Sequence, residues 1–182
     1  MLVILDRDGV INEDRADFVK SPEELVLIEG TVDAIARLKS RNHRVVIATN
    51  QSCIGRGIIN EERLHSIHAK MLDAIARAGG SIDQIYYAPD APWAETPMRK
   101  PGSGMLTKAM EDFKTTPSNT IMIGDSLRDL QAAYGCGVHR LLVQTGKGRK
   151  TQADGTLKDL LPVSVAANLS KAVDLIEDGR FI

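Results

Sequence analysis

Residues 4–12 read ILDRDGVIN, an apolar segment that runs directly into two aspartates. No residue before Asp6 has a polar side chain, so this segment predicts a buried strand. Asp6 and Asp8 are one strand period apart, which places both carboxylates on one side of the chain and Arg7 on the other. Two like charges this close repel each other, so we expect a metal ion, a shared proton or a phosphate group to compensate them. An Asx turn that simply ends the strand is the structural alternative.

Short apolar segments suited to buried strands alternate along the chain with segments of helical periodicity. This alternation predicts an α/β fold, a Rossmann-like parallel sheet with helices on both faces. The strands predicted after the first are 45–48, 85–88, 121–123 and 141–143, and the predicted helices are 31–39, 61–78, 104–113, 127–134 and 169–177. We expect Asn60 to cap the second of these helices and Ser103 the third.

The overall composition is that of an ordinary water-soluble protein. A chain of 182 residues with 43% hydrophobic residues suits one domain spanning 1–182, and no segment is long enough to add a large cap domain. A formal net charge of −1 gives no electrostatic reason to expect nucleic acid or a membrane as a partner. No basic segment followed by a long apolar run begins the chain, so we expect a cytoplasmic setting, and a monomer.

Polar residues stand where the predicted strands end. The carboxyl ends of parallel strands meet at one edge of a sheet, so we expect these residues to converge despite their separation in sequence. They are Asp6 and Asp8 after the first strand, Thr49, Asn50, Gln51 and Ser52 after the second, Asp125 and Ser126 after the fourth, and Arg99 and Lys100 ahead of the helix preceding the fourth.

Hard carboxylate oxygens in this arrangement suit Mg²⁺, which uses one or two carboxylates plus substrate phosphate. A metal ion would neutralise the paired aspartates and leave one of them able to attack phosphorus. Thr49 and Lys100 could hold the phosphate oxygens, while the second aspartate protonates the leaving alcohol and later activates water. These residue types together indicate phosphoryl chemistry.

Four segments resemble, in order, the four motifs of the haloacid dehalogenase-like phosphatases. Within that family, DRDG, TNQSCIGRG and RKPGSGML are similar to the branch that contains heptose bisphosphate phosphatases and histidinol-phosphate phosphatases. The four segments are LDRDGVI at 5–11, ATNQS at 48–52, RKP at 99–101 and IMIGDSLRDLQAA at 121–133.

The resemblance implies a role for each motif residue. Asp6 is the expected nucleophile, and Asp8 the general acid and base. Mg²⁺ is expected to bind Asp6, the backbone carbonyl of Asp8, and Asp125. Thr49 and Lys100 are expected to stabilise the phosphoryl group.

Substrate recognition is expected from residues around these motifs. The segment 12–29 is long for a connection, so we expect a small flap over the site. Arg99 is expected to help recognise the substrate, and Asp129 to orient Lys100 or the metal shell. The candidate substrate-binding residues are Asp14, Asp17, Asn50, Gln51, Ser52 and Arg99.

Two features depart from the branch that the motifs resemble. Relatives often carry a zinc loop before the Arg-Lys-Pro motif, but the shortened loop at about 88–99 offers Ala88, Asp90, Thr96 and Met98 at the ligand positions. Zinc requires about four ligands, chiefly nitrogen or sulfur, so we expect no zinc. Ser126 stands where heptose-specific relatives often have a lysine that contacts substrate.

Other polar residues are interpreted as structural. His65 and His68 lie three positions apart on the long predicted helix and are predicted to be helix-surface residues. The glycine- and lysine-rich segment 146–150 lacks the spacing of a phosphate-binding loop and is predicted to be flexible.

The resemblance therefore implies a Mg²⁺-dependent phosphomonoesterase that works through an aspartyl-phosphate. The expected substrate is a small phosphorylated sugar, with the C7 phosphate of D-glycero-D-manno-heptose 1,7-bisphosphate the one removed. Histidinol phosphate, or another small sugar phosphate, is the alternative. A phosphorylation-switch receiver domain is an alternative of a different class, although it has no use for an acid/base at Asp8.

Overall fold

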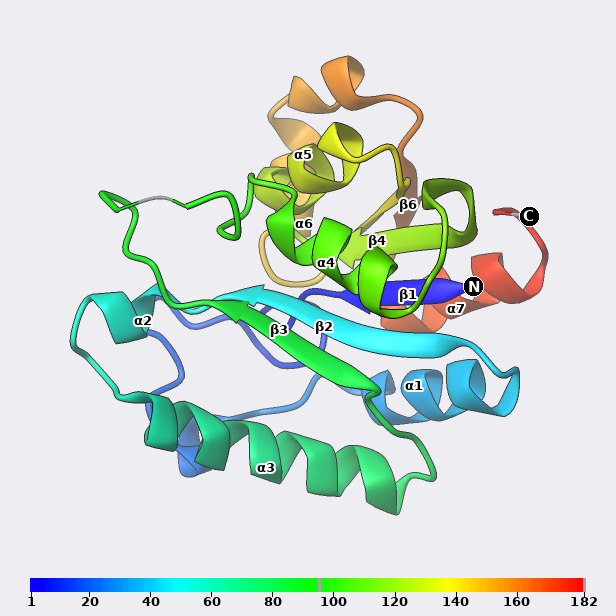
Figure 1. The fold of residues 1–182 in the computed structure, drawn as a ribbon. Helices are drawn as coiled ribbons and strands as arrows, with labels where there is room; N and C mark the ends of the chain where they lie inside the picture. Colours follow the sequence, from blue (N-terminus) through cyan, green and yellow to red (C-terminus); the bar gives the residue numbers. More distant parts are fainter. Residues whose placement is uncertain (95, 182) are drawn as a thin grey trace.

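Parallel strands form one central sheet in the computed structural model, which describes residues 1–94 and 96–181 (Figure 1). Within these residues the sheet has six strands, with the first strand of the chain near its middle. In spatial order they are β3 (Gln84–Ala88), β2 (Arg44–Asn50), β1 (Leu2–Leu5), β4 (Thr120–Gly124), β5 (His139–Val143) and β6 (Ser164–Ala166).

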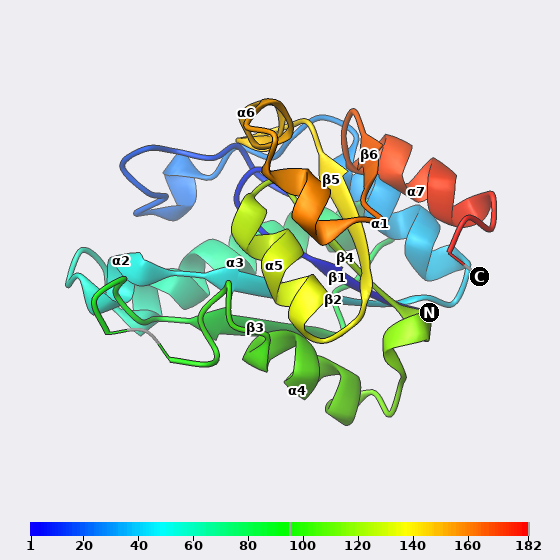
Figure 2. The ribbon, with the colours of Figure 1, turned by 90° about the horizontal axis from the view of Figure 1, so that it is seen from above.

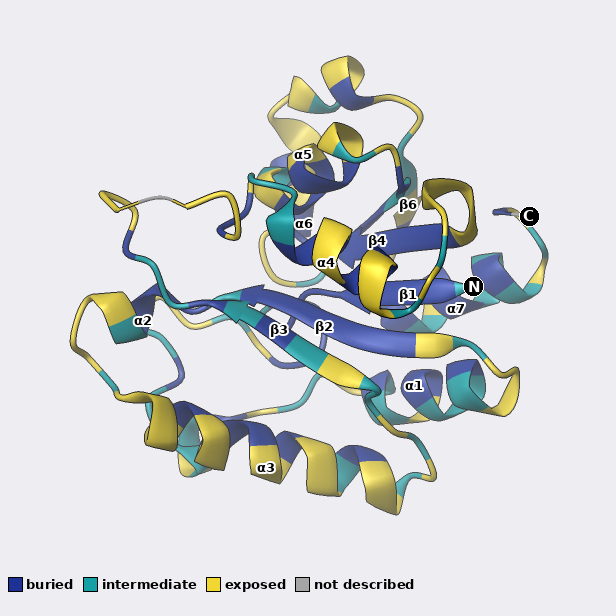
Figure 3. Cartoon of the chain, in the orientation of Figure 1, coloured by how far each residue is buried: buried dark blue, intermediate teal, exposed yellow. Residues whose placement is uncertain are grey.

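Strand β1 is paired on both sides, which explains its apolar sequence. Leu2 is in register with Arg44 of β2 and with Thr120 of β4. Because both edges and both faces of β1 are covered, all four of its residues are buried (Figure 3).

Helices cover the sheet on both faces, and alternate strand residues point to each layer (Figure 1). Val3 and Leu5 of β1 pack with residues of α1, α3 and α7, whereas Ile4 packs with residues of α4 and α5. None of the helices in the described ranges has the length and apolar character needed to cross a membrane. The helices are α1 (Thr31–Ser40), α2 (Ser52–Gly55), α3 (Glu61–Arg77), α4 (Gly104–Asp112), α5 (Leu127–Gly135), α6 (Gly148–Ala153) and α7 (Leu169–Glu177).

The structure confirms the predicted α/β class, the five predicted strands and the five predicted helices, with small shifts at their ends. The Asn60 side chain accepts a hydrogen bond from the Arg63 backbone N–H, as expected of a helix cap. Ser103 is at the N-cap position of α4, as predicted, but its side chain makes no capping hydrogen bond, because its hydroxyl donates to the Ala132 carbonyl of α5. The prediction of a flexible loop at 146–150 is also wrong in part, since α6 begins at Gly148.

The connections at the carboxyl ends of the strands gather at one end of the molecule (Figure 2). The segment 12–29 starts there, and Asn12 forms an antiparallel bridge with Leu27, which folds the segment back on itself. The short helix α2 and the connection after β3 lie at the same end, whereas both chain termini lie at the opposite one (Figures 1 and 2). This end is where a parallel sheet places a ligand site.

Candidate active site

A cavity of about 570 Å³ opens at the carboxyl ends of β1, β2 and β4. It brings together nearly all the residues singled out from the sequence. Asp17 is the exception: it does not line the cavity, and its exposed carboxylate pairs with Arg15 and Lys20. The predicted residues that do line it are Asp6, Asp8, Asp14, Thr49, Asn50, Gln51, Ser52, Arg99, Lys100, Asp125, Ser126 and Asp129.

Three carboxylates meet at the floor of the cavity. Ligand oxygens of Asp6, Asp125 and Asp129 all lie within 4.8 Å of one another. Burial and the neighbouring Asp129 raise the pKa of Asp6 to about 7, even though Lys100 opposes the shift. Burial, Asp6 and Asp129 raise the pKa of Asp125 to about 8. Such mutual repulsion between buried charges is relieved by a cation.

Two glycines make the space in which Asp125 sits. A Cβ on Gly9 would lie 2.0 Å from Asp125 Oδ2, and a Cβ on Gly146 would lie 2.2 Å from it. The Lys147 backbone N–H donates to the same oxygen at 2.7 Å. These contacts fix the carboxylate facing Asp6, and hard oxygens so arranged fit Mg²⁺.

Lys100 is the cation that the fold itself supplies, and it is 2% exposed. Its Nζ lies 3.0 Å from Asp6 Oδ1 and donates to Asp129 Oδ1 at 2.5 Å and to the Ala48 carbonyl at 2.7 Å. Burial lowers the pKa of Lys100, but Asp129 and Asp6 more than offset this and raise it above its usual value. Lys100 therefore stays charged beside Asp6.

Asp129 has little capacity left for a metal ion. Its other oxygen, Oδ2, accepts from the Ser126 backbone N–H at 3.0 Å and from the Ser126 hydroxyl at 2.6 Å. The bond from the Ser126 backbone N–H is one half of the capping box that begins α5, and the Ser126 side chain accepts from the Asp129 backbone N–H as the other half. The geometry therefore suits the expected role of Asp129 in orienting Lys100, and it gives Ser126 a structural function that the sequence did not suggest.

Asn50 and Gln51 were expected to bind substrate, but both side chains already bond protein groups. Asn50 donates to the Lys100 carbonyl at 2.8 Å and accepts from the Lys100 backbone N–H at 3.0 Å. Gln51 Nε2 donates to Asp8 Oδ2 and to Thr49 Oγ1, both at 2.9 Å. These amides thus hold catalytic candidates in place from within the cavity wall.

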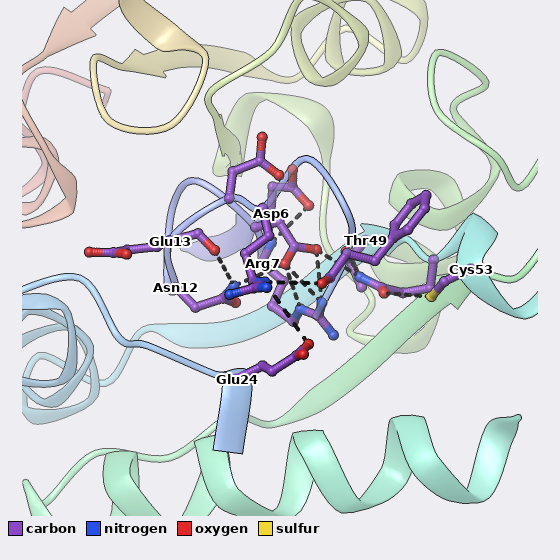
Figure 4. A network of polar contacts seen from close by, with 12 residues as sticks. Asp6, Arg7, Asn12, Glu13, Glu24, Thr49 and Cys53 are labelled. Carbon is purple, nitrogen blue, oxygen red and sulfur yellow. Dashed lines mark hydrogen bonds and ion pairs between the residues drawn. The ribbon is translucent and has the colours of Figure 1, made fainter. Parts of the chain in front are cut away.

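Asp8 is held by a neighbour that was expected to point away. The Arg7 guanidinium reaches back to Asp8, with Nη2 donating to Oδ1 at 2.8 Å and to Oδ2 at 2.9 Å (Figure 4). Asn12 Nδ2 donates to Asp8 Oδ1 at 2.9 Å. Burial raises the pKa of Asp8, but the Arg7 charge and these hydrogen bonds outweigh it and hold the pKa below its usual value.

His68 contradicts its prediction as a helix-surface residue. It is 5% exposed, and its Nε2 lies 3.3 Å from Arg7 Nη1. In the sequence, only Asp6 and Asp8 drew attention to the segment that contains Arg7. No sequence pattern indicated that Arg7 is buried or that α3 supplies its partner.

Cationic side chains form the rim of the cavity. The sequence had pointed to Arg99 and Arg15 among them, but not to Arg56 or Arg128. Arg56 lies 5.9 Å from the Phe18 ring centroid and 5.0 Å from that of Trp93, which joins the segment 12–29 to the loop after β3. Besides Arg7 and Lys100, the cationic lining residues are Arg15, Arg56, Arg99, Arg128 and Lys147.

The loop in which zinc was not expected contributes Pro92 and Arg99 to the cavity wall. Asp90, its one conventional ligand among the four positions considered, accepts a hydrogen bond from Thr96 at 3.0 Å. Arg99 Nη1 donates to the Asp90 carbonyl at 3.0 Å. That the loop at about 88–99 binds no zinc stays a prediction.

Comparison with known proteins places this site in a family. A family model described as HAD-hydrolase-like matches residues 97–172. The chain is 46% identical over 158 residues to D-glycero-beta-D-manno-heptose-1,7-bisphosphate 7-phosphatase of Bordetella bronchiseptica, covering 87% of this chain and 88% of that protein. It is 47% identical over 150 residues to the protein of that name from Neisseria meningitidis serogroup A, with coverage of 82% and 80%.

Solved structures agree with the sequence comparison. The D,D-heptose 1,7-bisphosphate phosphatase from B. bronchiseptica, crystallised with magnesium and phosphate, aligns with a TM-score of 0.94 and 42% identity over 98% of each chain. The D,D-heptose 1,7-bisphosphate phosphatase from Burkholderia thailandensis aligns with a TM-score of 0.75 and 40% identity, covering 96% of this chain and 97% of that one. The chain therefore belongs to the haloacid dehalogenase-like hydrolase family, in the group formed by the heptose 1,7-bisphosphate phosphatases.

Proposed function

We propose that this protein is a Mg²⁺-dependent phosphatase that removes the C7 phosphate of D-glycero-D-manno-heptose 1,7-bisphosphate. The observation that carries the proposal is the placement of Asp6 beside both a carboxylate cluster and the buried Lys100, at the floor of an open cavity. The names of the relatives and the magnesium and phosphate bound by one of them support it.

Asp6 is the nucleophile in this proposal. One of its oxygens attacks phosphorus, the bond to the sugar oxygen breaks, and an aspartyl-phosphate forms. Asp6 and Asp125, with the backbone carbonyl of Asp8, would hold Mg²⁺, which neutralises the carboxylates and the phosphoryl oxygens when bound. Lys100, with Thr49 opposite, stabilises the negative charge on the equatorial oxygens.

Asp8 supplies and removes the protons. In the first step it donates a proton to the departing sugar oxygen. In the second it takes a proton from water as the water oxygen attacks phosphorus and the bond to Asp6 breaks. The ionised carboxylate held by Arg7 is the form that activates water. An incoming phosphate adds negative charge beside Asp8 and raises its pKa, which favours the acid form that the first step needs.

The cationic rim supports a bisphosphate over histidinol phosphate. Arg15, Arg56, Arg99 and Arg128 all line the cavity that holds Asp6. A second phosphate is attracted by these guanidinium groups, which can bind it at two points. Histidinol phosphate carries an ammonium group at its far end, which the same charges repel.

The test is phosphate release from three compounds: the heptose 1,7-bisphosphate, histidinol phosphate and p-nitrophenyl phosphate. We expect the highest kcat/KM with the bisphosphate, a product that retains its C1 phosphate, and loss of activity with a chelator that Mg²⁺ reverses. Asp6→Asn should abolish release, because an amide cannot form the acyl phosphate. Unchanged turnover in Asp6→Asn would exclude the mechanism, and a preference for histidinol phosphate would exclude the substrate.

A further inference from the structure

Arg7 is a buried arginine placed between two different elements. Its side chain is 1% exposed, and its guanidinium has two sets of partners. Nε and Nη2 face the Asp8 carboxylate, while Nη1 faces His68 of α3. Since a guanidinium is rigid and planar, the partner at one end fixes the orientation that the other end presents.

His68 occupies a position where an apolar residue would be expected. It lies on the buried face of α3, with Leu64, Ile67 and Met71. A buried polar group there costs free energy unless it is hydrogen-bonded. Burial and the charge of Arg7 lower the pKa of His68 to about 3, so the imidazole is neutral and its Nε2 accepts from Arg7 Nη1.

We propose that His68 is a positioning residue for the reaction, acting through Arg7 on the Asp8 carboxylate. This inference rests on the acid/base role given to Asp8 above. Without an acceptor at position 68, the buried Nη1 loses its partner and the guanidinium is free to turn. The two-point contact with Asp8 then loosens, and Asp8 no longer holds its place beside the leaving oxygen and the attacking water.

The test compares variants that remove the acceptor with one that keeps it. His68→Leu and His68→Phe suit the apolar face of α3 and lack an acceptor. His68→Gln places an amide oxygen at about the same reach. We expect kcat on the sugar phosphate to fall about tenfold in the first two, with KM within about twofold of wild type. His68→Gln should recover kcat to within about threefold.

His65→Leu is the matched control. His65 is on the same helix, is exposed, and makes a similar edge contact with Tyr87, but it does not contact Arg7. We expect wild-type kinetics from it. Circular dichroism and Tm on every variant identify losses of fold, which lower the active fraction and therefore the apparent kcat at unchanged KM, so kcat is calculated per folded enzyme.

A double-mutant cycle shows whether His68 acts through Asp8. In an Asp8→Asn background, His68→Leu should cause no further loss of kcat, because the group that it positions is already gone. An additive loss, wild-type kcat in His68→Leu and His68→Phe, or failure of His68→Gln to recover activity would each overturn the inference. If Asp8→Asn alone leaves turnover unchanged, the acid/base role itself fails. If Asp8→Asn lowers kcat but the His68 variants keep wild-type kcat, the acid/base role of Asp8 stands and only the positioning role of His68 is excluded.

Discussion

Arg99 and Lys100 are neighbours with different surroundings. Lys100 Nζ turns inward to Asp6, whereas Arg99 bonds the Asp90 carbonyl in the loop after β3 and lines the cavity wall. The two residues lie in a turn, in which the Gly102 backbone N–H donates to the Arg99 carbonyl at 2.7 Å, and their side chains diverge from it. In the proposed mechanism Lys100 would therefore serve the phosphate that is transferred, and Arg99 is expected to contact the rest of the substrate.

Arg99→Ala should for this reason distinguish substrates. We expect it to cost about 1.5–3 kcal/mol in kcat/KM with the heptose bisphosphate, the contribution of a charge-assisted hydrogen bond. The cost with p-nitrophenyl phosphate, which lacks a distal group, should be much smaller. Steady-state kinetics with both esters measure the ratio, and Arg140→Ala on β5, outside the cavity, is the control. Equal losses of kcat/KM on both esters would mean that Arg99 acts in the chemical step or stabilises the loop after β3, and does not recognise the distal part of the substrate.

Which residues could be predicted depended on whether their role is visible in local sequence. Asp6, Asp125 and Lys100 belong to short motifs at strand ends, and the parallel sheet brings them together. The burial of Arg7 could not be predicted, because strand alternation indicates only that the side chains of Arg7 and Asp6 point to opposite sides of the strand. Its guanidinium then turns back to Asp8, and its second partner, His68, is 61 positions away. Long-range polar pairing of this kind leaves no periodic pattern.

At the scale of elements, the turn after β5 determines where Asp125 can sit. Gly146 has φ +54°, and a Cβ there would also lie 2.6 Å from Gly9 Cα, so neither neighbour has room to move away. The carboxylate that should bind the metal ion is thus positioned by backbone from two other connections. This explains how two glycine-containing loops, remote in sequence, take part in one site.

Gly146→Ala should weaken the metal site more than the fold. We expect the Mg²⁺ concentration for half-maximal activity to rise by at least about tenfold, as for loss of a well-placed supporting group around a metal. Gly79→Ala is the matched control, because Gly79 also has positive φ (+82°) but a Cβ there meets nothing within 4 Å. Both variants gain backbone strain at a positive φ, and Gly146→Ala should lose the more stability because its Cβ also clashes with Asp125 and the Gly9 backbone. An equal change in Mg²⁺ requirement in both would exclude the steric argument.

Elements with strong periodicity were predictable, and the short ones were not. Strand β6 has three residues, Ser164–Ala166, too few for an alternation pattern. Helix α6 starts at Gly148 in a basic, glycine-rich segment that indicates a loop by composition. At its first residue the chain passes so close to β5 that a Cβ on Gly148 would lie 1.7 Å from the Val143 carbonyl oxygen, which requires a glycine there.

For the whole molecule, the carboxylate cluster makes stability depend on pH and on metal. The pKa of Asp6 is about 7 and that of Asp125 about 8 in the folded, metal-free state, against 3.8 for an ordinary aspartate. Up to about pH 8, Asp6 and Asp125 therefore hold more protons in the folded state than in the unfolded state. Below about pH 6.5, His68 opposes them, because its folded pKa is depressed to about 3.

Between about pH 6.5 and pH 8 the aspartates dominate, so the Tm of the metal-free protein should fall as pH rises through this window. Mg²⁺ replaces the protons and should raise Tm more at the upper end of the window than at the lower one. Thermal unfolding in a chelator and in excess Mg²⁺ at both ends measures this difference. A Mg²⁺ shift that is equal at both ends would contradict the shared carboxylate site. Asp125→Asn, which removes one charge, should reduce both effects.

The central place of β1 in the sheet has a consequence for the chain as it is made on the ribosome. Strand β1 is synthesised first, and β2 can pair with it by residue 50, but its other neighbour, β4, is complete only at residue 124. At about 5–20 residues per second, those 74 residues take roughly 4–15 s, during which one edge of an apolar strand has no partner. An open edge of that kind is a site for pairing with other chains. The order of the strands thus leaves this edge open to other chains for several seconds during synthesis, and Asp6 at the end of β1 cannot reach its final surroundings until most of the chain has been translated.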